Sequence, residues 1–157
     1  DEEFADNKLR GIYIGNFIEW DPISQTELII DKYDWEPARL PFERTYRNFS
    51  NLDDMHENGI HDYMKWIKFG YGRCSDHASK DIRTGHLTRD EAIVLVEKYD
   101  HVKPYRDLNR WLSYVDMTED KFDSIADSFR DHRVWSKDHK GEWVKDDIRS
   151  FDLRKGA

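Results

Sequence analysis

The segment 68–91 limits the possible fold most, because it carries the signals for two successive helix starts. Ser75 follows two glycines and stands where an N-cap residue is expected, which predicts a short helix over about 76–85. Thr88 and Glu91 then form the Thr-x-x-Glu pattern of a capping box in front of an apolar run, which predicts a second helix. The sequence therefore brings two polar helix N-termini close together.

These helix starts are a candidate binding site for an anion. A helix N-terminus has unpaired N–H groups and the positive end of the helix dipole, so it favours a phosphate or a carboxylate. Five nearby side chains are predicted to bind the substrate: Lys68, Arg73, Ser79, Arg83 and Arg89.

Two residues of the first helix are candidates for catalysis. His77 is predicted to exchange a proton with the reacting group, because the unperturbed pKa of imidazole lies near neutrality. Asp76 is predicted to orient His77, although the helix dipole alone also favours an Asp in a first turn. The alternative for the whole segment is a pair of solvated helices whose charges only pair with each other.

Composition excludes several classes of protein. The 157 residues suffice for one domain, expected over 1–157, and the 14% of aromatic residues argue against disorder. The net charge of −8 argues against nucleic-acid binding. Cys74 is the only cysteine, so no disulfide within the chain and no thiolate zinc site are expected.

No membrane segment and no cofactor of its own are expected for this chain. Apolar runs stay far below the ~20 residues of a membrane span, and the first six residues do not resemble a signal peptide, so we expect a cytoplasmic protein. The phosphate-loop, dinucleotide, zinc-protease and serine-hydrolase motifs are missing. The histidines lack a third ligand nearby, so no metal site is predicted.

The remaining periodicities predict a mostly α-helical domain with a minor β component. The predicted elements are a strand at 11–18, helices at 22–33, 54–69, 88–99, 108–115 and 118–129, and a hairpin at 133–144. An ordered loop is predicted over 36–54, and its arginines form the densest positive cluster of the chain. That loop either closes over an anionic ligand or wraps the domain and pairs its arginines with acids. The last residues, 149–157, are expected to be a frayed tail.

One long motif resembles a known family. It runs Ile67-Lys-Phe-Gly-Tyr-Gly-Arg-Cys-Ser-Asp-His-Ala-Ser-Lys-Asp-Ile-Arg-Thr-Gly-His-Leu-Thr-Arg-Asp-Glu-Ala92. Together with Tyr13, Asn16, Ile18, Trp20-Asp-Pro22 and Gln25 upstream, and Lys103-Pro104 and the Trp135 segment downstream, it is similar to the N-acetyl sugar amidotransferases. These enzymes act in the synthesis of lipopolysaccharide and of surface sugars of the pseudaminic acid type. The resemblance covers nearly the whole chain.

The resemblance implies an ATP-dependent ligase of the PP-loop kind. Such an enzyme activates the carbonyl oxygen of a sugar acetamido group, and ammonia from a partner glutaminase converts that group to an acetamidino group. The implied substrate is a nucleotide-linked or acidic N-acetyl sugar, and the complete enzyme would use ATP and Mg²⁺.

The chain lacks two parts of the family pattern, the Ser-Gly-Gly-x-Asp-Ser nucleotide loop and a cysteine-rich metal knuckle. The resemblance therefore implies the C-terminal region alone, either a fragment or one half of a split enzyme, inactive without its PP-loop ATP-binding part. Two functions stay open, a substrate-facing part of the amidotransferase and a non-catalytic docking module that holds the ligase against its glutaminase. Convergence of Lys68, Arg73, Asp76, His77 and Arg83 on one concavity would favour the first.

Overall fold

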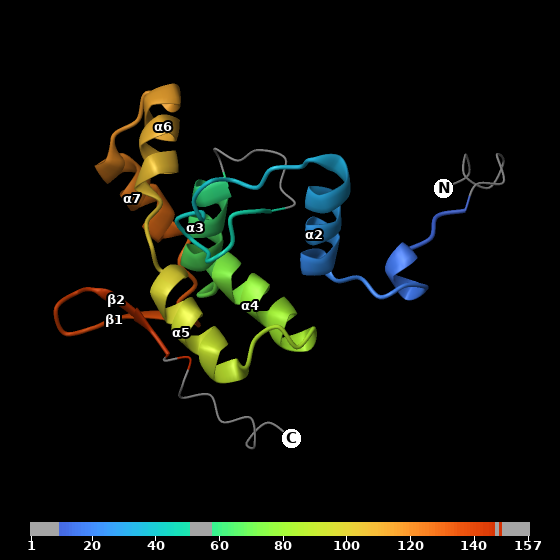
Figure 1. Cartoon of the computed structure of the whole chain (residues 1–157). Coiled ribbons are helices and arrows are strands. Elements are labelled where there is room, and N and C mark those ends of the chain that lie inside the picture. The colour runs from blue at the N-terminus through green and yellow to red at the C-terminus, as the bar shows by residue number, and fades with distance from the viewer. Residues whose placement is uncertain (1–9, 51–57, 147, 149–157) are drawn as a thin grey trace, which may run out of the picture. The chain divides into compact units, whose positions relative to one another are not determined.

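The computed structural model describes residues 10–50, 58–146 and 148. It divides into two compact units, Asp1–Glu36 and Pro37–Ala157, which we call the N-terminal unit and the C-terminal unit (Figure 1). The single domain predicted over 1–157 stays a prediction.

The N-terminal unit contains a short 3-10 helix, η1 (Ile14–Asn16), and the α-helix α2 (Pro22–Tyr33). The helix starts as its sequence predicts, because the Asp21 carboxylate accepts a hydrogen bond from the Ile23 N–H at 3.1 Å and Pro22 needs no partner for a missing N–H. The predicted helix over 22–33 is confirmed.

The strand predicted over 11–18 is wrong. The Asn16 N–H donates to the Tyr13 carbonyl at 3.0 Å, and the Phe17 N–H donates to the Ile14 carbonyl at 2.9 Å, so these backbone groups bond within a turn. A strand needs a partner for its N–H and C=O groups, and the described part of the N-terminal unit contains no second strand. The β-propensity of these residues is not enough to form a strand without a partner strand.

The C-terminal unit is mostly helical. Its elements are α3 (Asn58–Phe69), α4 (Arg73–Arg83), α5 (Arg89–Tyr99), α6 (Tyr105–Val115), α7 (Glu119–Ser128), β1 (Trp135–Lys137) and β2 (Trp143–Lys145). The fold class predicted from the sequence, mostly α with a minor β component, is confirmed. The predicted helix start near residue 54 and the predicted tail at 149–157 lie outside the described residues.

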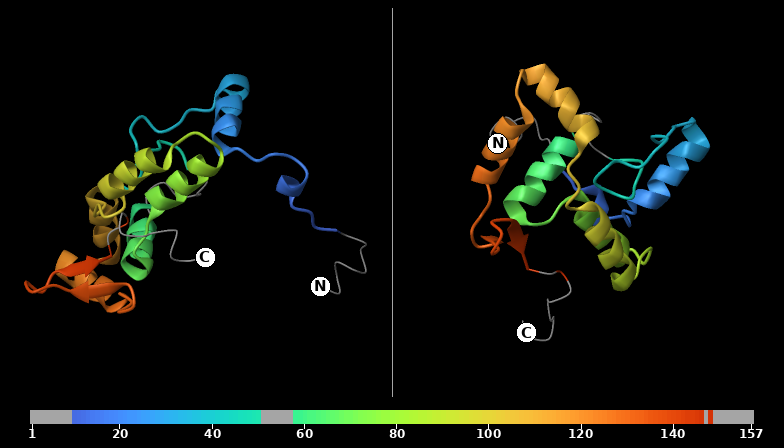
Figure 2. Two further views of the ribbon diagram at one scale, coloured as in Figure 1. Left: turned by 90° about the horizontal axis from the view of Figure 1, so that it is seen from below. Right: turned by 90° about the vertical axis from the view of Figure 1, so that its left-hand side faces the viewer.

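The apolar core lies where α6 and α7 pack against α3 (Figure 2). Leu108 and Leu112 of α6 meet Phe122 and Ala126 of α7, and all four are buried. Burial of a side chain such as Leu108 stabilises the fold by about 1.5–3 kcal/mol. This core fixes α3, and α3 in turn carries one wall of the polar centre described below.

The helices α4 and α5 form a second pair, joined by a turn. The predicted capping box is present at the start of α5, where the Thr88 hydroxyl accepts from the Glu91 N–H at 3.3 Å and the Glu91 carboxylate accepts from the Thr88 N–H at 2.8 Å. The predicted second helix of the segment 68–91 is therefore confirmed.

The predicted hairpin is also present. Its strands β1 and β2 pair antiparallel with Trp135 opposite Lys145. Trp135 is buried and meets the Trp66 ring edge to face at 4.7 Å, while the guanidinium of Arg130 lies 4.4 Å from the Trp135 ring centre. These aromatic and cation–π contacts hold the hairpin on α3.

Gly59 tests the close approach of α3 to α6. Its N–H donates to the Asp107 carboxylate at 3.0 Å, and a Cβ at this position would lie 2.8 Å from Cβ of Pro104. Gly→Ala in an exposed helix gains about 1 kcal/mol, but here we expect Gly59→Ala to lower the free energy of unfolding by about 1–3 kcal/mol.

Urea unfolding of Gly59→Ala beside Gly11→Ala measures this effect. Nothing lies within 4 Å of a Cβ built on Gly11, so that control should unfold like the parent chain. A Gly59→Ala protein as stable as the parent would show that the two helices are not packed this closely.

Candidate functional site

The first turn of α4 differs from its prediction. The helix begins at Arg73, not at Asp76, and its N-cap residue is Gly72, which has no side chain to cap the helix. Ser75 therefore lies inside the first turn, and its hydroxyl donates to the Asp100 carboxylate at 2.6 Å. The predicted N-cap at Ser75 is wrong because a residue distant in sequence takes that role.

Asp100 caps α4 from the end of α5. Its carboxylate accepts from the Gly72 N–H at 2.8 Å and from the Ser75 N–H at 3.1 Å. Asp100 is only 4% exposed, so these charge-assisted bonds form away from water, where they are strong. A carboxylate does bind at this helix N-terminus, as the dipole argument predicts, but it belongs to the protein itself.

Arg44 completes the contacts around Asp100. Its guanidinium donates to the backbone carbonyls of Asp100 and Val102. Burial disfavours the charged form and lowers the pKa of Arg44 to about 10, while Asp100 and Asp62 oppose that shift. Gly72 is required for this approach, because a Cβ there would lie 2.9 Å from both the Arg44 guanidinium and the Asp100 carboxylate.

Two further residues of the segment 37–50, Tyr46 and Arg47, bond to α4. The Arg47 guanidinium and the Tyr46 hydroxyl both donate to the buried carboxylate of Asp81. Arg47 thus pairs with an acid, as the alternative of a wrapping loop expects, whereas Arg44 donates to backbone carbonyls. Neither is placed to close over an external anion.

His77 lies on the buried face of α4. Its Nδ1 is 2.7 Å from the Thr45 hydroxyl, and the residue is 4% exposed. Burial, reinforced by the nearby charge of Arg47, lowers the pKa of His77 to about 3. The imidazole is therefore neutral at pH 7, so it can exchange hydrogen bonds there but is a poor source of a proton.

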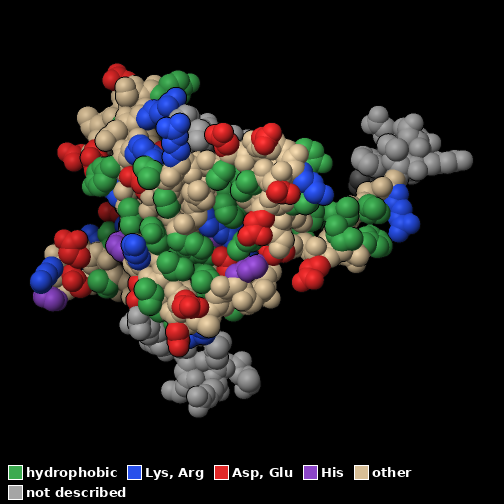
Figure 3. Space-filling model, in the orientation of Figure 1, with side chains coloured by type: hydrophobic (Ala, Val, Ile, Leu, Met, Phe, Trp, Pro, Cys, Tyr) green, Lys and Arg blue, Asp and Glu red, His purple; other side chains and the backbone are tan. Residues whose placement is uncertain are grey.

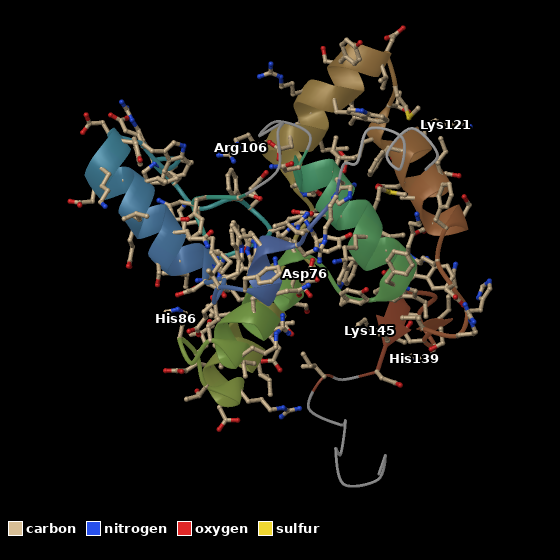
Figure 4. All side chains as sticks on the ribbon, turned by 90° about the vertical axis from the view of Figure 1, so that its right-hand side faces the viewer. Asp76, His86, Arg106, Lys121, His139 and Lys145 are labelled. Atoms are coloured by element: carbon tan, nitrogen blue, oxygen red, sulfur yellow. The ribbon has the colours of Figure 1, made fainter. Side chains whose placement is uncertain are left out.

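Arg73 and Asp76 face α3. The Arg73 guanidinium contacts the Asp62 carboxylate through Nε at 3.0 Å and Nη2 at 2.9 Å. Asp76, labelled in Figure 4, forms an ion pair with Lys65, and its carboxylate lies 3.9 Å from Nη1 of Arg73. Asp76 does not contact the imidazole in any hydrogen bond found among the described residues.

Arg73 and His77 share a small cavity between the segment 37–50, α3 and α4. It is lined in part by Thr45, Asp62 and Asp107, and its volume is about 10 Å³. That volume holds about one water molecule. The structure therefore brings these two predicted site residues together, but in a cavity too small for a sugar.

The other predicted site residues lie elsewhere on the surface. Arg83 is exposed and donates to the Ser79 hydroxyl at 2.8 Å. The Lys68 ammonium lies 5.6 Å from the Phe69 ring centre, and Arg89 is exposed in the first turn of α5. None of these four lines the cavity at Arg73 and His77.

Sequence reasoning missed the residues that hold this centre together: Arg44, Thr45, Asp62, Asp81 and Asp100. Each lies on a different turn or element from its partner, so no local spacing connects them. The nearest signal was the arginine cluster of the predicted loop, which contains Arg44 and Arg47.

Cys74 is a buried thiol of α4. Burial raises its pKa to about 12, so the reactive thiolate is scarce at neutral pH. Within the described ranges, no cluster of three His, Cys, Asp or Glu side chains is arranged to ligate a metal. None of the helices described has the length and apolar character needed to cross a bilayer.

Comparison with known proteins defines the class. Residues 43–148, which lie within the C-terminal unit, match the family described as "LPS biosynthesis protein WbpG-like, C-terminal domain". The chain belongs to this family, which places it among proteins of lipopolysaccharide biosynthesis. The match confirms the resemblance read from the motif at 67–92, namely to the C-terminal region of an amidotransferase-like family of lipopolysaccharide synthesis. No curated protein matches the chain.

Asp100→Asn tests the cap of α4. The amide would direct an NH₂ group at donors that now meet a carboxylate oxygen, so we expect a loss of about 2–4 kcal/mol in the free energy of unfolding. Chemical denaturation measures it, with Asp31→Asn on the exposed side of α2 as the matched control. Equal stability of the two variants would mean that Asp100 does not cap α4.

His77 predicts a pH dependence of stability. Its pKa is about 3 in the folded protein and about 6.5 in the unfolded chain, so between these values the unfolded chain binds more protons and stability falls as the pH falls. From pH 7 to pH 5 this contribution is about 2 kcal/mol.

The variant His77→Asn keeps a polar atom near Nδ1 and does not titrate. Its stability should therefore fall by about 2 kcal/mol less than that of the parent between pH 7 and pH 5, measured by denaturation at each pH. Parallel curves for the two proteins would contradict the buried neutral imidazole.

Proposed function

We propose that this chain is the substrate-facing C-terminal part of an ATP-dependent N-acetyl sugar amidotransferase. The complete enzyme would convert a sugar acetamido group to an acetamidino group with ammonia from a glutaminase, in the synthesis of surface polysaccharide. The observation that carries the proposal is the family match over 43–148, which includes the whole motif 67–92.

ATP and Mg²⁺ would bind to the PP-loop part of the enzyme, where they would supply activation of the acetamido oxygen. This chain has no Ser-Gly-Gly-x-Asp-Ser loop to cradle a nucleotide of that kind. We therefore assign to its own residues only binding, orientation and the exclusion of water.

Arg73 and His77 are the proposed contacts with the reacting end of the sugar. Asp62 orients the guanidinium, and Thr45 engages Nδ1 of the imidazole, so a contact with substrate would use Nε2. The neutral imidazole suits a hydrogen bond to an amide better than the delivery of a proton at pH 7. The small cavity would have to widen when the substrate and the ATP-binding part are present.

The docking module is the second candidate. It is favoured by the scatter of the remaining predicted residues, since Lys68, Arg83 and Arg89 lie on the exposed surface rather than at one concavity. In that case the buried polar centre would only fix the shape of a surface that binds the ligase or the glutaminase. Ser79 and Asp76 would then have structural or surface roles.

Turnover in the reconstituted enzyme separates the two candidates. We expect Arg73→Gln to lower turnover roughly tenfold to hundredfold, because one charge-assisted contact contributes about 1.5–3 kcal/mol. Arg83→Gln, with an exposed side chain, serves as the control and should retain turnover. The assay is run well below the melting temperature of both variants, with binding to the glutaminase measured in parallel.

The substrate-facing role requires that Arg73→Gln lose amidination while its affinity for the glutaminase and the ATP-binding part is unchanged. Loss of that affinity, with normal turnover once the partners are saturating, would instead establish the docking module.

A further inference from the structure

A groove in the C-terminal unit gathers three arginines, and it shares Phe42 and Asp107 with the cavity at Arg73 and His77. Its volume is about 380 Å³, and it is lined by Ala38, Arg39, Leu40, Phe42, Arg106, Asp107 and Arg110. One wall comes from the segment 37–50 and the other from the first turns of α6. This volume lies in the range of pockets that bind small ligands.

The side chains that line this groove carry more positive than negative charge. Three arginines and one aspartate line it, which leaves two formal positive charges (3 − 1) on a chain of net charge −8. Among the described residues, Arg39 and Arg110 make no ion pair, and the Nε of Arg106 is 3.8 Å from the Asp107 carboxylate. The Asp107 carboxylate also accepts from the buried Gly59 N–H.

Helix geometry adds a second argument. Arg106 and Arg110 are four residues apart on α6, so they lie on one face, where like charges repel. Figure 3 shows Lys and Arg side chains gathered in the region of α6. In Figure 4 the Arg106 side chain extends from the start of α6. A bound anion would relieve this repulsion.

The chemistry of the walls indicates the kind of anion. Three guanidinium groups on two elements can contact more phosphate oxygens than one arginine, which reaches two at most in a bidentate contact. Leu40 and Phe42 add an apolar surface beside them, which suits a ring attached to the phosphates.

We propose that this groove binds a diphosphate group. This identification rests on the proposed function: the diphosphate is that of the nucleotide-linked sugar, and the nucleoside lies beside the apolar side chains of Leu40 and Phe42. Arg39, Arg106 and Arg110 thus anchor the carrier. Free pyrophosphate carries the same group, so the test separates the two sources.

Isothermal titration calorimetry of the 157-residue chain at low salt, with pyrophosphate and with uridine diphosphate, tests this site. We expect both probes to bind, and the double variant Arg106→Gln/Arg110→Gln to bind each at least tenfold more weakly. The Glu43 carboxylate accepts from the Arg106 backbone N–H, so that contact survives in the variant. Arg133→Gln, whose parent side chain is 90% exposed and pairs with Asp131, is the matched control and should bind like the parent.

Tighter binding of uridine diphosphate assigns the groove to the nucleotide-linked ligand, and equal binding assigns it to free pyrophosphate. No binding by the parent chain, or equal binding by the double variant, overturns the site. If the reconstituted enzyme is active but this chain binds no diphosphate, the diphosphate site is rejected and the proposed function stands. If the chain binds diphosphate but the reconstituted enzyme is inactive on N-acetyl sugars, the proposed function is rejected and the diphosphate site stands.

Discussion

The carboxylate of Asp100 at the N-terminus of α4 is the interaction on which the C-terminal unit depends. It satisfies two backbone donors of a helix whose own N-cap, Gly72, has no side chain. The same residue offers its carbonyl to the buried guanidinium of Arg44. One aspartate thus links the end of α5, the start of α4 and the segment 37–50.

This arrangement divides the arginines into two groups. Arg44 and Arg47 are buried and bonded to carbonyls or to Asp81, so removing either would leave buried polar groups unpaired. Arg39, Arg106 and Arg110 instead line an open groove. In this acidic chain, the buried arginines therefore stabilise the fold, and the arginines of the groove form a surface that can bind an anion.

The sequence predicted features whose signals are local. The capping box of Thr88 and Glu91 and the hairpin around Gly141 depend on residues within a few positions of each other, and both are present. The predicted cap at Ser75 failed because its competitor, Asp100, lies 25 residues further on. The prediction of a strand at 11–18 was wrong because a strand must pair with a second strand, and the described part of the N-terminal unit contains none.

In the candidate site, too, contacts between residues distant in sequence could not be predicted. His77 and Arg73 come together because α4 turns both toward the segment 37–50 and α3. The low pKa of His77 could not be predicted, since it arises from burial under residues remote in sequence. Nor could the groove, because Arg39 and Arg106 meet only when the segment 37–50 lies beside α6.

Amide hydrogen exchange at Gly72 and Ser75 tests most directly whether Asp100 organises this unit. First-turn amides of a helix lack intrahelical partners and normally exchange fast, but these two donate to a buried carboxylate. We expect both to exchange as slowly as the core amides of α3 and α6, at the rate set by global unfolding. Exchange as fast as at the exposed first turn of α7 would contradict the account.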